Sequence, residues 1–381
     1  MNSQRRDLIG ALVAPLFVPQ SAFGQNSKIT YAVIATGGRG RYLMTKFKQL
    51  GCLCTDICDI YEPNLQKGAE IEPEAKKWVD YHEMLQGCKA DCIVIASPDH
   101  HHAPMLFAAL DAKKDVYLEK PLSHSLEQSE RMIKAVRDSK QIVQIGMQRR
   151  SAPALIEAKR FVDDGMLGFV SIVKAQWNWN ISADLDNSTL PGKLDWPRFL
   201  GTAKQRELEP MRFRRWRYFF DYAGGNMTDQ GTHLMDVVQW FTKNAAPTAA
   251  QASGYVAKMR GSEHPDVFSA VFEYPKMLAT WTLDYCNAYQ NGWSIFLQGD
   301  KGTMILDDAG YTVYAEPWKK GAAPKMEKAS PVPVEAHIQN FLDCMKSRQQ
   351  PNATVDIAAA AVAGPHMANK AMFDGRKFVR A

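Results

Sequence analysis

Three side chains in this sequence have the chemistry to take a proton from a hydroxyl group. Lys120 follows a short apolar run, and Asp229 and His233 lie four residues apart. On a helix, positions i and i+4 share one face, so Asp229 and His233 could meet the same substrate hydroxyls. A lysine near another positive charge can have its pKa lowered enough to act as a base or relay, and histidine carries protons near neutral pH. The structural alternatives are a solvated loop lysine at Lys120 and a helix cap at Asp229.

A glycine-rich loop predicts a dinucleotide site. The apolar run 29–35 ends in Ala35-Thr36-Gly37-Gly38-Arg39-Gly40, and a helical stretch at 42–50 follows. In the G-x-G-x-x-G fingerprint, the second glycine allows a pyrophosphate to approach the backbone, and the third allows the helix to pack on the strand. The helix N-terminus supplies N–H donors for the phosphates. Ala35 replaces the first glycine here, and alanine costs less at that place than any larger residue.

An acidic residue after the second apolar run, 52–58, predicts which nucleotide binds. Asp59 lies 59 − 40 = 19 residues beyond Gly40, where a carboxylate would bind the ribose 2′-hydroxyl. The same charge would repel a 2′-phosphate, so NAD is favoured over NADP. Asp56 is the competing candidate. With a nicotinamide ring as hydride acceptor, the proton acceptors above predict oxidation of an alcohol.

Two further runs end in polar residues. The run 92–96 is followed by Ser97-Pro98-Asp99-His100-His101-His102, and the run 116–118 by Glu119-Lys120-Pro121. Ligands bind at the carboxyl ends of parallel strands, so we expect both segments at the cofactor edge. Three consecutive histidines do not share a face of a helix or strand and make a poor metal cage, so we expect no metal there.

Aromatic and basic residues gather in the segment 177–222, which holds four of the nine tryptophans. Rings that stack on the C–H face of a sugar, beside donors for its hydroxyls, predict a carbohydrate substrate. Packing between domains, or a contact between subunits, is the alternative. The residues concerned are Trp177, Trp179, Trp196, Trp216, Arg212, Arg214, Arg215, Arg217, Tyr218 and Tyr222.

The elements that must position these residues form two domains. Over residues 28–150, continuous apolar runs alternate with stretches of helical spacing, at 105–110 and 126–136, which predicts a doubly wound parallel sheet. After a helix at 154–162, residues 151–381 carry runs rich in β-branched and aromatic residues, separated by turns, and end in helices at 336–346 and 357–373. The fold class is therefore α/β, a Rossmann-type domain followed by an α+β domain with a mostly antiparallel open sheet. We assign substrate binding and oligomerisation to the second domain.

Composition excludes several classes of protein. The chain has 46 basic and 41 acidic residues and no block of consecutive lysines and arginines, so nucleic acid is not an expected partner. No apolar run approaches the roughly 18 residues of a membrane span. Seven cysteines cannot all pair with one another, and Cys52, Cys54 and Cys58 lie in a run that predicts buried core cysteines rather than a metal site.

The N-terminus predicts an export signal. Arg5-Arg6 precede an apolar run, 8–18, and small residues at Ala22 and Gly24 suit a cleavage site. The paired arginines favour the twin-arginine type, with residues 1–24 as the signal and a periplasmic or secreted product exported in the folded state. The structural alternative is a frayed N-terminal helix.

Together these motifs resemble the glucose–fructose oxidoreductase / inositol dehydrogenase / rhizopine-catabolism (Gfo/Idh/MocA) family. The glycine loop, Asp59, Ser97-Pro98 and Glu119-Lys120-Pro121 carry the resemblance, with Gln144-Ile145-Gly146-Met147-Gln148-Arg149 and Gly225-x3-Asp229-x-Gly231-x-His233. The region around Trp177 and Asp195-Trp196 resembles the family's exported members. The resemblance implies Lys120 as the catalytic lysine, with Asp229 and His233 as an acid/base pair.

These observations define the candidate site. The expected cofactor-binding residues are Gly37, Gly38, Arg39, Gly40, Asp59, Ser97, Pro98, His102, Glu119, Lys120 and Gln148, and the expected substrate-binding residues are Arg149, Trp177, Arg215, Tyr222 and His233. We expect an NAD(P)-dependent oxidoreductase acting on a sugar or polyol, as a dimer or tetramer, with NAD held tightly through export. The alternatives are a redox-assisted glycosidase similar to glycoside hydrolase family 109, and a non-catalytic sugar- or nucleotide-binding protein.

Overall fold

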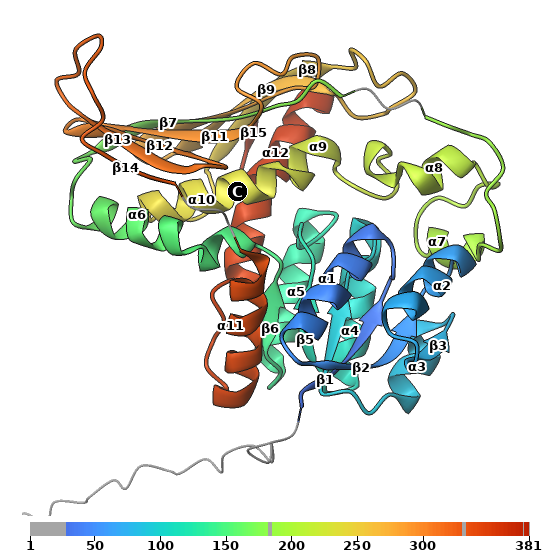
Figure 1. Ribbon diagram of the computed structural model, residues 1–381. Coiled ribbons are helices and arrows are strands. Elements are labelled where there is room, and N and C mark those ends of the chain that lie inside the picture. The colour runs from blue at the N-terminus through green and yellow to red at the C-terminus, as the bar shows by residue number, and fades with distance from the viewer. Residues whose placement is uncertain (1–27, 182–184, 330–332, 376, 381) are drawn as a thin grey trace, which may run out of the picture.

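A computed structural model describes residues 28–181, 185–329, 333–375 and 377–380. The chain builds two sheets that share long helices (Figure 1). The expected export signal, residues 1–24, lies outside the described residues. Within the described residues, no helix combines the length and apolar character needed to cross a bilayer.

The first sheet is parallel throughout, with strand order β3-β2-β1-β4-β5-β6. Strand order reverses between β1 and β4, where the two halves of a doubly wound sheet meet and ligands bind. Its strands are β1 (Thr30–Ile34), β2 (Leu53–Cys58), β3 (Lys76–Trp78), β4 (Cys92–Ile95), β5 (Asp115–Leu118) and β6 (Val143–Ile145). The helices between them are α1 (Gly38–Gln49), α2 (Glu62–Ile71), α3 (Tyr81–Gly87), α4 (His102–Asp111) and α5 (Leu126–Asp138), with a 3-10 turn η1 (Asp99–His101) before α4.

The second sheet has the order β14-β13-β12-β11-β7-β10-β9-β8-β15 and is antiparallel except where β7 meets β10. The predicted fold class is thus confirmed. Its strands are β7 (Val170–Asn178), β8 (Ala249–Tyr255), β9 (Val267–Tyr274), β10 (Met277–Asp284), β11 (Gly292–Gly299), β12 (Gly302–Asp307), β13 (Gly310–Ala315), β14 (Met326–Ala329) and β15 (Phe378–Val379). The remaining helices are η2 (Gln148–Ser151), α6 (Pro153–Asp163), α7 (Trp196–Leu200), α8 (Pro210–Arg214), η3 (Trp216–Tyr218), α9 (Gly225–Asp229), α10 (Gly231–Thr242), α11 (Val334–Ser347) and α12 (Val355–Asp374).

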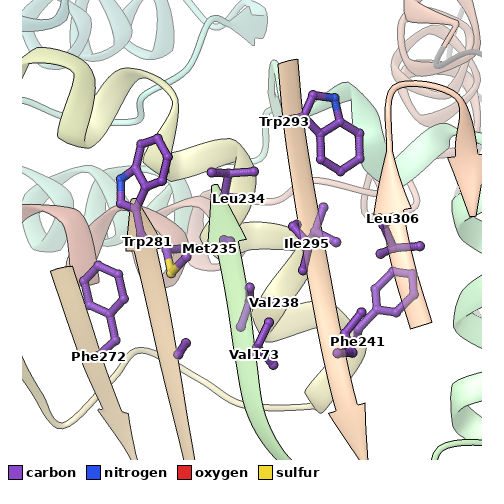
Figure 2. Packing of buried hydrophobic residues seen from close by; sticks show 14 of the residues in the cluster. Val173, Leu234, Met235, Val238, Phe241, Phe272, Trp281, Trp293, Ile295 and Leu306 are labelled. Atoms are coloured by element: carbon purple, nitrogen blue, oxygen red, sulfur yellow. The ribbon is translucent and has the colours of Figure 1, made fainter. Parts of the chain in front are cut away.

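One face of the second sheet holds its core. Helices α6, α10 and α12 lie on that face in Figure 1, and the opposite face carries no helix there. Figure 2 shows Leu234, Met235 and Val238 of α10 pointing at Val173 and Ile295 of the sheet. Along β9 and β10, buried residues alternate with more exposed ones, which is the pattern of a strand with one face in the core.

The C-terminal helices join the two sheets. We expected this tail with the second domain, but α11 buries Ile338 and Phe341 in the cluster around β1. The first half of α12 packs with α5 and β6, where Val355 and Val362 belong to the hydrophobic cluster of the first sheet, and its second half packs under β8 through Met367. Because a parallel sheet has two apolar faces, the tail supplies cover that the helices α1–α5 leave incomplete.

The cysteine prediction is confirmed. Cys52, Cys54 and Cys58 are buried in or beside β2, and each belongs to a hydrophobic cluster. Burial raises the pKa of the Cys54 thiol to about 12, so these side chains are unreactive packing groups.

Candidate active site

The glycine loop closes tightly against β1 and β2. Ala35 adopts a left-handed backbone with φ 72°, and its N–H donates to the Cys58 carbonyl at 2.8 Å. A Cβ on Gly40 would lie 2.0 Å from the Ala35 carbonyl oxygen, so only glycine allows α1 to start there. At Gly38 the space is open, and no side chain caps α1. The free N–H groups of this helix end are suited to a phosphate.

Asp59, rather than Asp56, faces the cavity beside this loop. Its carboxylate accepts hydrogen bonds from Thr36 N–H and Tyr61 N–H, each at 2.8 Å. Burial raises its pKa to about 6. The Asp56 carboxylate accepts from the indole N–H of Trp78 at 2.8 Å and stabilises the packing of β3. Asp59 therefore fits the ribose role, and it also holds the loop backbone in place.

A cavity of about 880 Å³ runs from the glycine loop along the carboxyl edge of the first sheet. The expected cofactor residues Gly37, Gly38, Arg39, Asp59, Ser97 and Pro98 line it. Opposite them lie residues of the second domain, which sequence reasoning did not assign to the cofactor: Asp195, Pro197, Arg198, Phe199, Gly201, Thr202, Phe213, Arg214, Trp216 and Arg217. The cavity suits an elongated ligand enclosed from both domains.

Residues 191–202 connect the second-domain side of the cavity to the first domain, and we call them the cover segment. Tyr61 Oη donates to the Pro191 carbonyl at 2.7 Å, and Asp195 N–H donates to the Ile60 carbonyl at 3.0 Å. The Arg198 guanidinium pairs with Asp80 at 3.0 Å. Figure 1 shows α7, within this segment, beside α2.

Two of the three consecutive histidines contact the cover segment, and the third contacts two loops of the first domain. Nε2 of His100 and of His101 each lies 2.8 Å from the Phe199 carbonyl oxygen of the cover segment. His102 contacts the carbonyls of Pro121 and Ser97 at 2.7 and 3.0 Å, and burial lowers its pKa to about 4. Contrary to expectation, His102 does not line the cavity. Its ring instead contacts the backbone of the loop at Ser97 and of the loop at Pro121, and so holds both loops in position. Among the described residues, no three potential metal ligands come together.

Lys120 is held by Asp229 across the domain boundary. Its Nζ donates to Asp229 Oδ1 at 2.7 Å and to the Asp229 carbonyl at 3.0 Å. Arg217 Nε donates to the same carboxylate oxygen at 3.3 Å. The two cations hold the pKa of Asp229 well below its usual range, so this carboxylate is ionised and orients Lys120.

The pairing of Asp229 with His233 that we expected on one helix is not what the structure shows. Asp229 ends α9 and His233 lies in the first turn of α10, with Gln230 between the helices. The Asp229 carbonyl bonds to Lys120 instead of continuing the helix. Nδ1 of His233 is buried and has no hydrogen-bond partner among the described residues. Burial and the nearby charges of Lys120 and Arg149 lower the pKa of His233, so its imidazole is neutral and able to accept a proton.

Two further acidic residues complete the surroundings. Asp99, which sequence reasoning left without a role, is buried, and burial beside Asp229 raises its pKa to about 8. Glu119 accepts from Arg39 Nε at 2.7 Å and from Lys120 N–H at 3.2 Å. A Cβ on Gly146 would meet the Glu119 carboxylate at 2.8 Å, so this glycine makes room for it. Glu119 thus links the glycine loop to the lysine loop rather than lining the cavity.

The expected substrate residues divide into two groups. Arg149 and Trp177 lie together beside the site, with the Arg149 Cζ 5.3 Å from the Trp177 ring centroid. Tyr222 is fully buried among Trp196, Phe199 and His100 and cannot reach a substrate, which corrects our expectation.

Arg215 is exposed beside α8, whereas Arg217, two residues later, reaches Asp229. Both arginines flank Trp216 in one basic and aromatic stretch, and no local signal distinguishes them. Gln148 begins η2, and its Oε1 is buried without a partner among the described residues.

Family models of known proteins match both halves of the chain. Residues 29–147 match a family model described as "Oxidoreductase family, NAD-binding Rossmann fold", and residues 155–305 match the "GFO/IDH/MocA C-terminal domain". Inositol 2-dehydrogenase of Rubrobacter xylanophilus is 27% identical over 43% of this chain and 47% of its own length. The scyllo-inositol 2-dehydrogenase (NAD(+)) of Bacillus subtilis is 36% identical over 37% and 42%. The chain thus matches less than half the length of these relatives.

Solved structures share the fold over nearly the whole chain. WlbA dehydrogenase from Bordetella pertussis, in complex with NADH and UDP-GlcNAcA, covers 93% of this chain and 99% of its own, with 19% identity and a TM-score of 0.73. A levoglucosan dehydrogenase in complex with NADH covers the same shares, with 15% identity and a TM-score of 0.74. At these identities the likeness concerns the fold.

Proposed function

Since this chain belongs to the Gfo/Idh/MocA oxidoreductase family, we propose that it is an NAD(P)-dependent oxidoreductase acting on a hydroxyl of a sugar or polyol. The observation that carries the proposal is the Lys120–Asp229 pair beside a neutral, buried His233. An ammonium held in place can donate to a substrate oxygen, and a neutral imidazole can take the hydroxyl proton. The dehydrogenases among its relatives support the same class of substrate.

The residues present fit a nicotinamide dinucleotide. The α1 N-terminus and the open space at Gly38 suit the pyrophosphate, and Asp59 suits the ribose hydroxyls. When bound, NAD supplies the hydride acceptor. The negative charge of Asp59 favours NAD over NADP, because it repels a 2′-phosphate.

Within this chain the roles divide as follows. Asp229 holds Lys120 at its Nζ, and Lys120 orients the substrate hydroxyl. His233 accepts the hydroxyl proton on its neutral imidazole ring, which makes no hydrogen bond through its side chain among the described residues. Glu119 and His102 position the loops that carry Lys120 and Ser97.

Export with tightly bound NAD remains part of the proposal. The Arg5-Arg6 motif motivates the export, and free NAD is expected to be scarce outside the cytoplasm. The cover segment supports retention, since it encloses the cavity from the second domain. Denaturing the purified protein should release nucleotide; an apo preparation that turns over only with added NAD would contradict tight binding.

A homo-oligomer, dimer or tetramer, is also proposed. The outer face of the second sheet carries no helix in Figure 1, and Leu278 on β10 is 46% exposed. Sedimentation of the purified chain tests this directly.

A panel of sugars and polyols on cofactor-loaded protein, followed by nicotinamide absorbance, tests the function. Net formation of reduced nicotinamide supports the oxidoreductase. The redox-assisted glycosidase stays a sequence-based prediction, which release of an aglycone from chromogenic glycosides without net reduction would favour.

A further inference from the structure

Arg149 is a buried cation that makes no ion pair among the described residues, although the charges of Asp308 and Asp236 lie near enough to raise its pKa. It follows β6 in η2 at the carboxyl edge of the first sheet, and its side chain is among the buried charged groups at 6% exposure. Its Nη1 has no hydrogen-bond partner among the described residues. The next residue shows the usual arrangement: Arg150 Nε pairs with the buried Asp236 at 2.6 Å. Burying a charge without a partner is costly, so an unpaired buried arginine points to a missing anion.

The surroundings of Arg149 define the direction from which an anion could come. Its Cζ lies 4.0 Å from the ring centroid of Trp293 and 5.3 Å from that of Trp177, which face each other across β11 and β7. Ring faces interact with the plane of a guanidinium and leave its N–H edge for an in-plane acceptor. Nε1 of Trp177 is likewise buried without a partner among the described residues. Arg149 and Trp177, which lie close together, therefore each leave a buried N–H donor unused.

This place adjoins the candidate catalytic residues. The charge of Arg149 contributes to lowering the pKa of His233, so the two side chains lie within electrostatic reach. Figure 2 shows Trp293 at the same end of the sheet as Leu234, the residue after His233. A ligand held by Arg149 would therefore lie near the imidazole of His233.

We infer that the substrate is an acidic sugar, an aldonate or uronate, whose carboxylate is bound by Arg149 and the indole N–H of Trp177. A planar carboxylate matches the two in-plane donors of one guanidinium, whereas a phosphate dianion would require more than this single unpaired cation. The indole rings then offer their faces to the C–H surface of the sugar. The carboxylate contributes only to binding and takes no part in the redox change. This inference rests on the proposed function, which it narrows to one class of substrate.

The test compares acidic and neutral sugars of the same skeleton on cofactor-loaded, full-length protein. The pairs are D-glucuronate with D-glucose and D-gluconate with D-glucitol, with D-glucose 6-phosphate as a different anion. Two readouts are taken, nicotinamide absorbance and the ligand-induced shift of the unfolding temperature. Since a hydrogen bond to a charged group contributes about 1.5–3 kcal/mol, an acid should exceed its neutral partner in kcat/KM by about 10- to 150-fold.

Variants assign the preference to Arg149. Arg149→Gln should remove the advantage of the acids in both readouts, and Arg149→Lys should keep part of it, since the charge remains. Arg131→Gln is the matched control, because Arg131 also lies over a ring, that of Phe107, but on the exposed face of α5. Of the carboxylates whose charge raises the pKa of Arg149, that of half-buried Asp308 has the largest effect. Asp308→Asn should strengthen the binding of acidic sugars, because it removes a carboxylate that competes with the ligand for Arg149.

The outcomes separate the two proposals. If neutral sugars or the sugar phosphate are preferred, or if Arg149→Gln keeps the preference for acids, the inference is overturned while the oxidoreductase stands. If acids shift the unfolding temperature through Arg149 but no sugar is oxidised, the acid site stands and the proposed oxidoreductase function fails. Loss of acid binding in Asp308→Asn would also overturn the inference.

Discussion

The Nζ of Lys120 reaches both the carboxylate and the backbone carbonyl of Asp229, at 2.7 and 3.0 Å, across 109 positions of sequence. This carbonyl lies at the end of α9, where Gln230 separates α9 from α10. One residue thereby fixes the lysine twice, once by charge and once by backbone geometry. A flexible four-carbon side chain becomes a positioned donor.

Replacing Lys120 with Met should reduce kcat/KM by about 10²- to 10⁴-fold, the usual range for a lost acid/base group. Bound nucleotide should be retained, because the glycine loop and Asp59 do not depend on Lys120 for their contacts. Turnover and nucleotide content are measured on the same preparation. Lys134→Met, which alters an exposed pair with Asp138 on α5, is the control. Unchanged activity in Lys120→Met would remove the proposed mechanism and favour a non-catalytic binding protein.

The geometry of the glycine loop predicts that substitutions at its two ends change the stability of the protein in opposite directions. Ala35→Gly should relieve a left-handed alanine that costs about 1–2 kcal/mol, partly offset by the entropy of glycine, for a net gain of at most about 1 kcal/mol. Gly40→Ala should cost about 3 kcal/mol or more, since its Cβ would lie 2.0 Å from the Ala35 carbonyl. Thermal unfolding measures both, at about 2–4 °C for each kcal/mol. Equal stability of the two variants would contradict the loop geometry.

Asp59 should make cofactor affinity depend on pH. Its pKa in the folded protein is raised to about 6 from 3.8, so ribose hydroxyls meet an ionised acceptor only above that pH. NAD affinity should fall as pH decreases through about 6. The stability of the nucleotide-free protein should change in the opposite sense. Between pH 3.8 and about 6, Asp59 is mostly ionised in the unfolded chain but still protonated in the folded protein, so the free energy of unfolding falls as pH rises.

Asp59→Asn tests both trends at once. The variant should bind NAD weakly at all pH values, and its stability should lose the part of the pH dependence that arises from this group. Titration of nucleotide by fluorescence and unfolding curves from pH 4 to 8 measure the two quantities. A wild-type affinity that does not change across pH 6 would exclude Asp59 as the ribose acceptor.

The cover segment should slow the release of nucleotide. Arg198 lines the cavity and pairs with Asp80 of the first domain, so Arg198→Ala should raise the dissociation rate several-fold, up to about tenfold. Arg137→Ala removes a comparable arginine–aspartate pair, with Asp356, away from the cavity and serves as control. Stopped-flow displacement of bound NADH measures the rate. An unchanged rate would show that the segment does not retain the cofactor.

Much of the fold could be predicted because its signals are local. The runs around 52–58, 92–96 and 116–118 became β2, β4 and β5, since a parallel strand buried on both faces is continuously apolar. The short edge strand β3, Lys-Lys-Trp, carries no such signal and was missed. Strands β14 and β15 were missed for a related reason, since they lie at the two edges of the second sheet and bury few residues. Strand β13 was also missed, although it is paired on both sides and buries Tyr311 and Val313.

The sequence by itself determined the glycine loop, Asp59 and the lysine loop, because each is a few neighbouring residues whose chemistry depends on local backbone. Only the tertiary structure decided how distant side chains pair. It directed Asp229 to Lys120 rather than to His233, buried Tyr222, chose Arg217 over Arg215, and left Arg149 without an ion pair among the described residues. These outcomes depend on which side chains from the two domains meet at the boundary between them. Burial and long-range charge pairing are properties of that assembled surface, and no spacing within the chain encodes them.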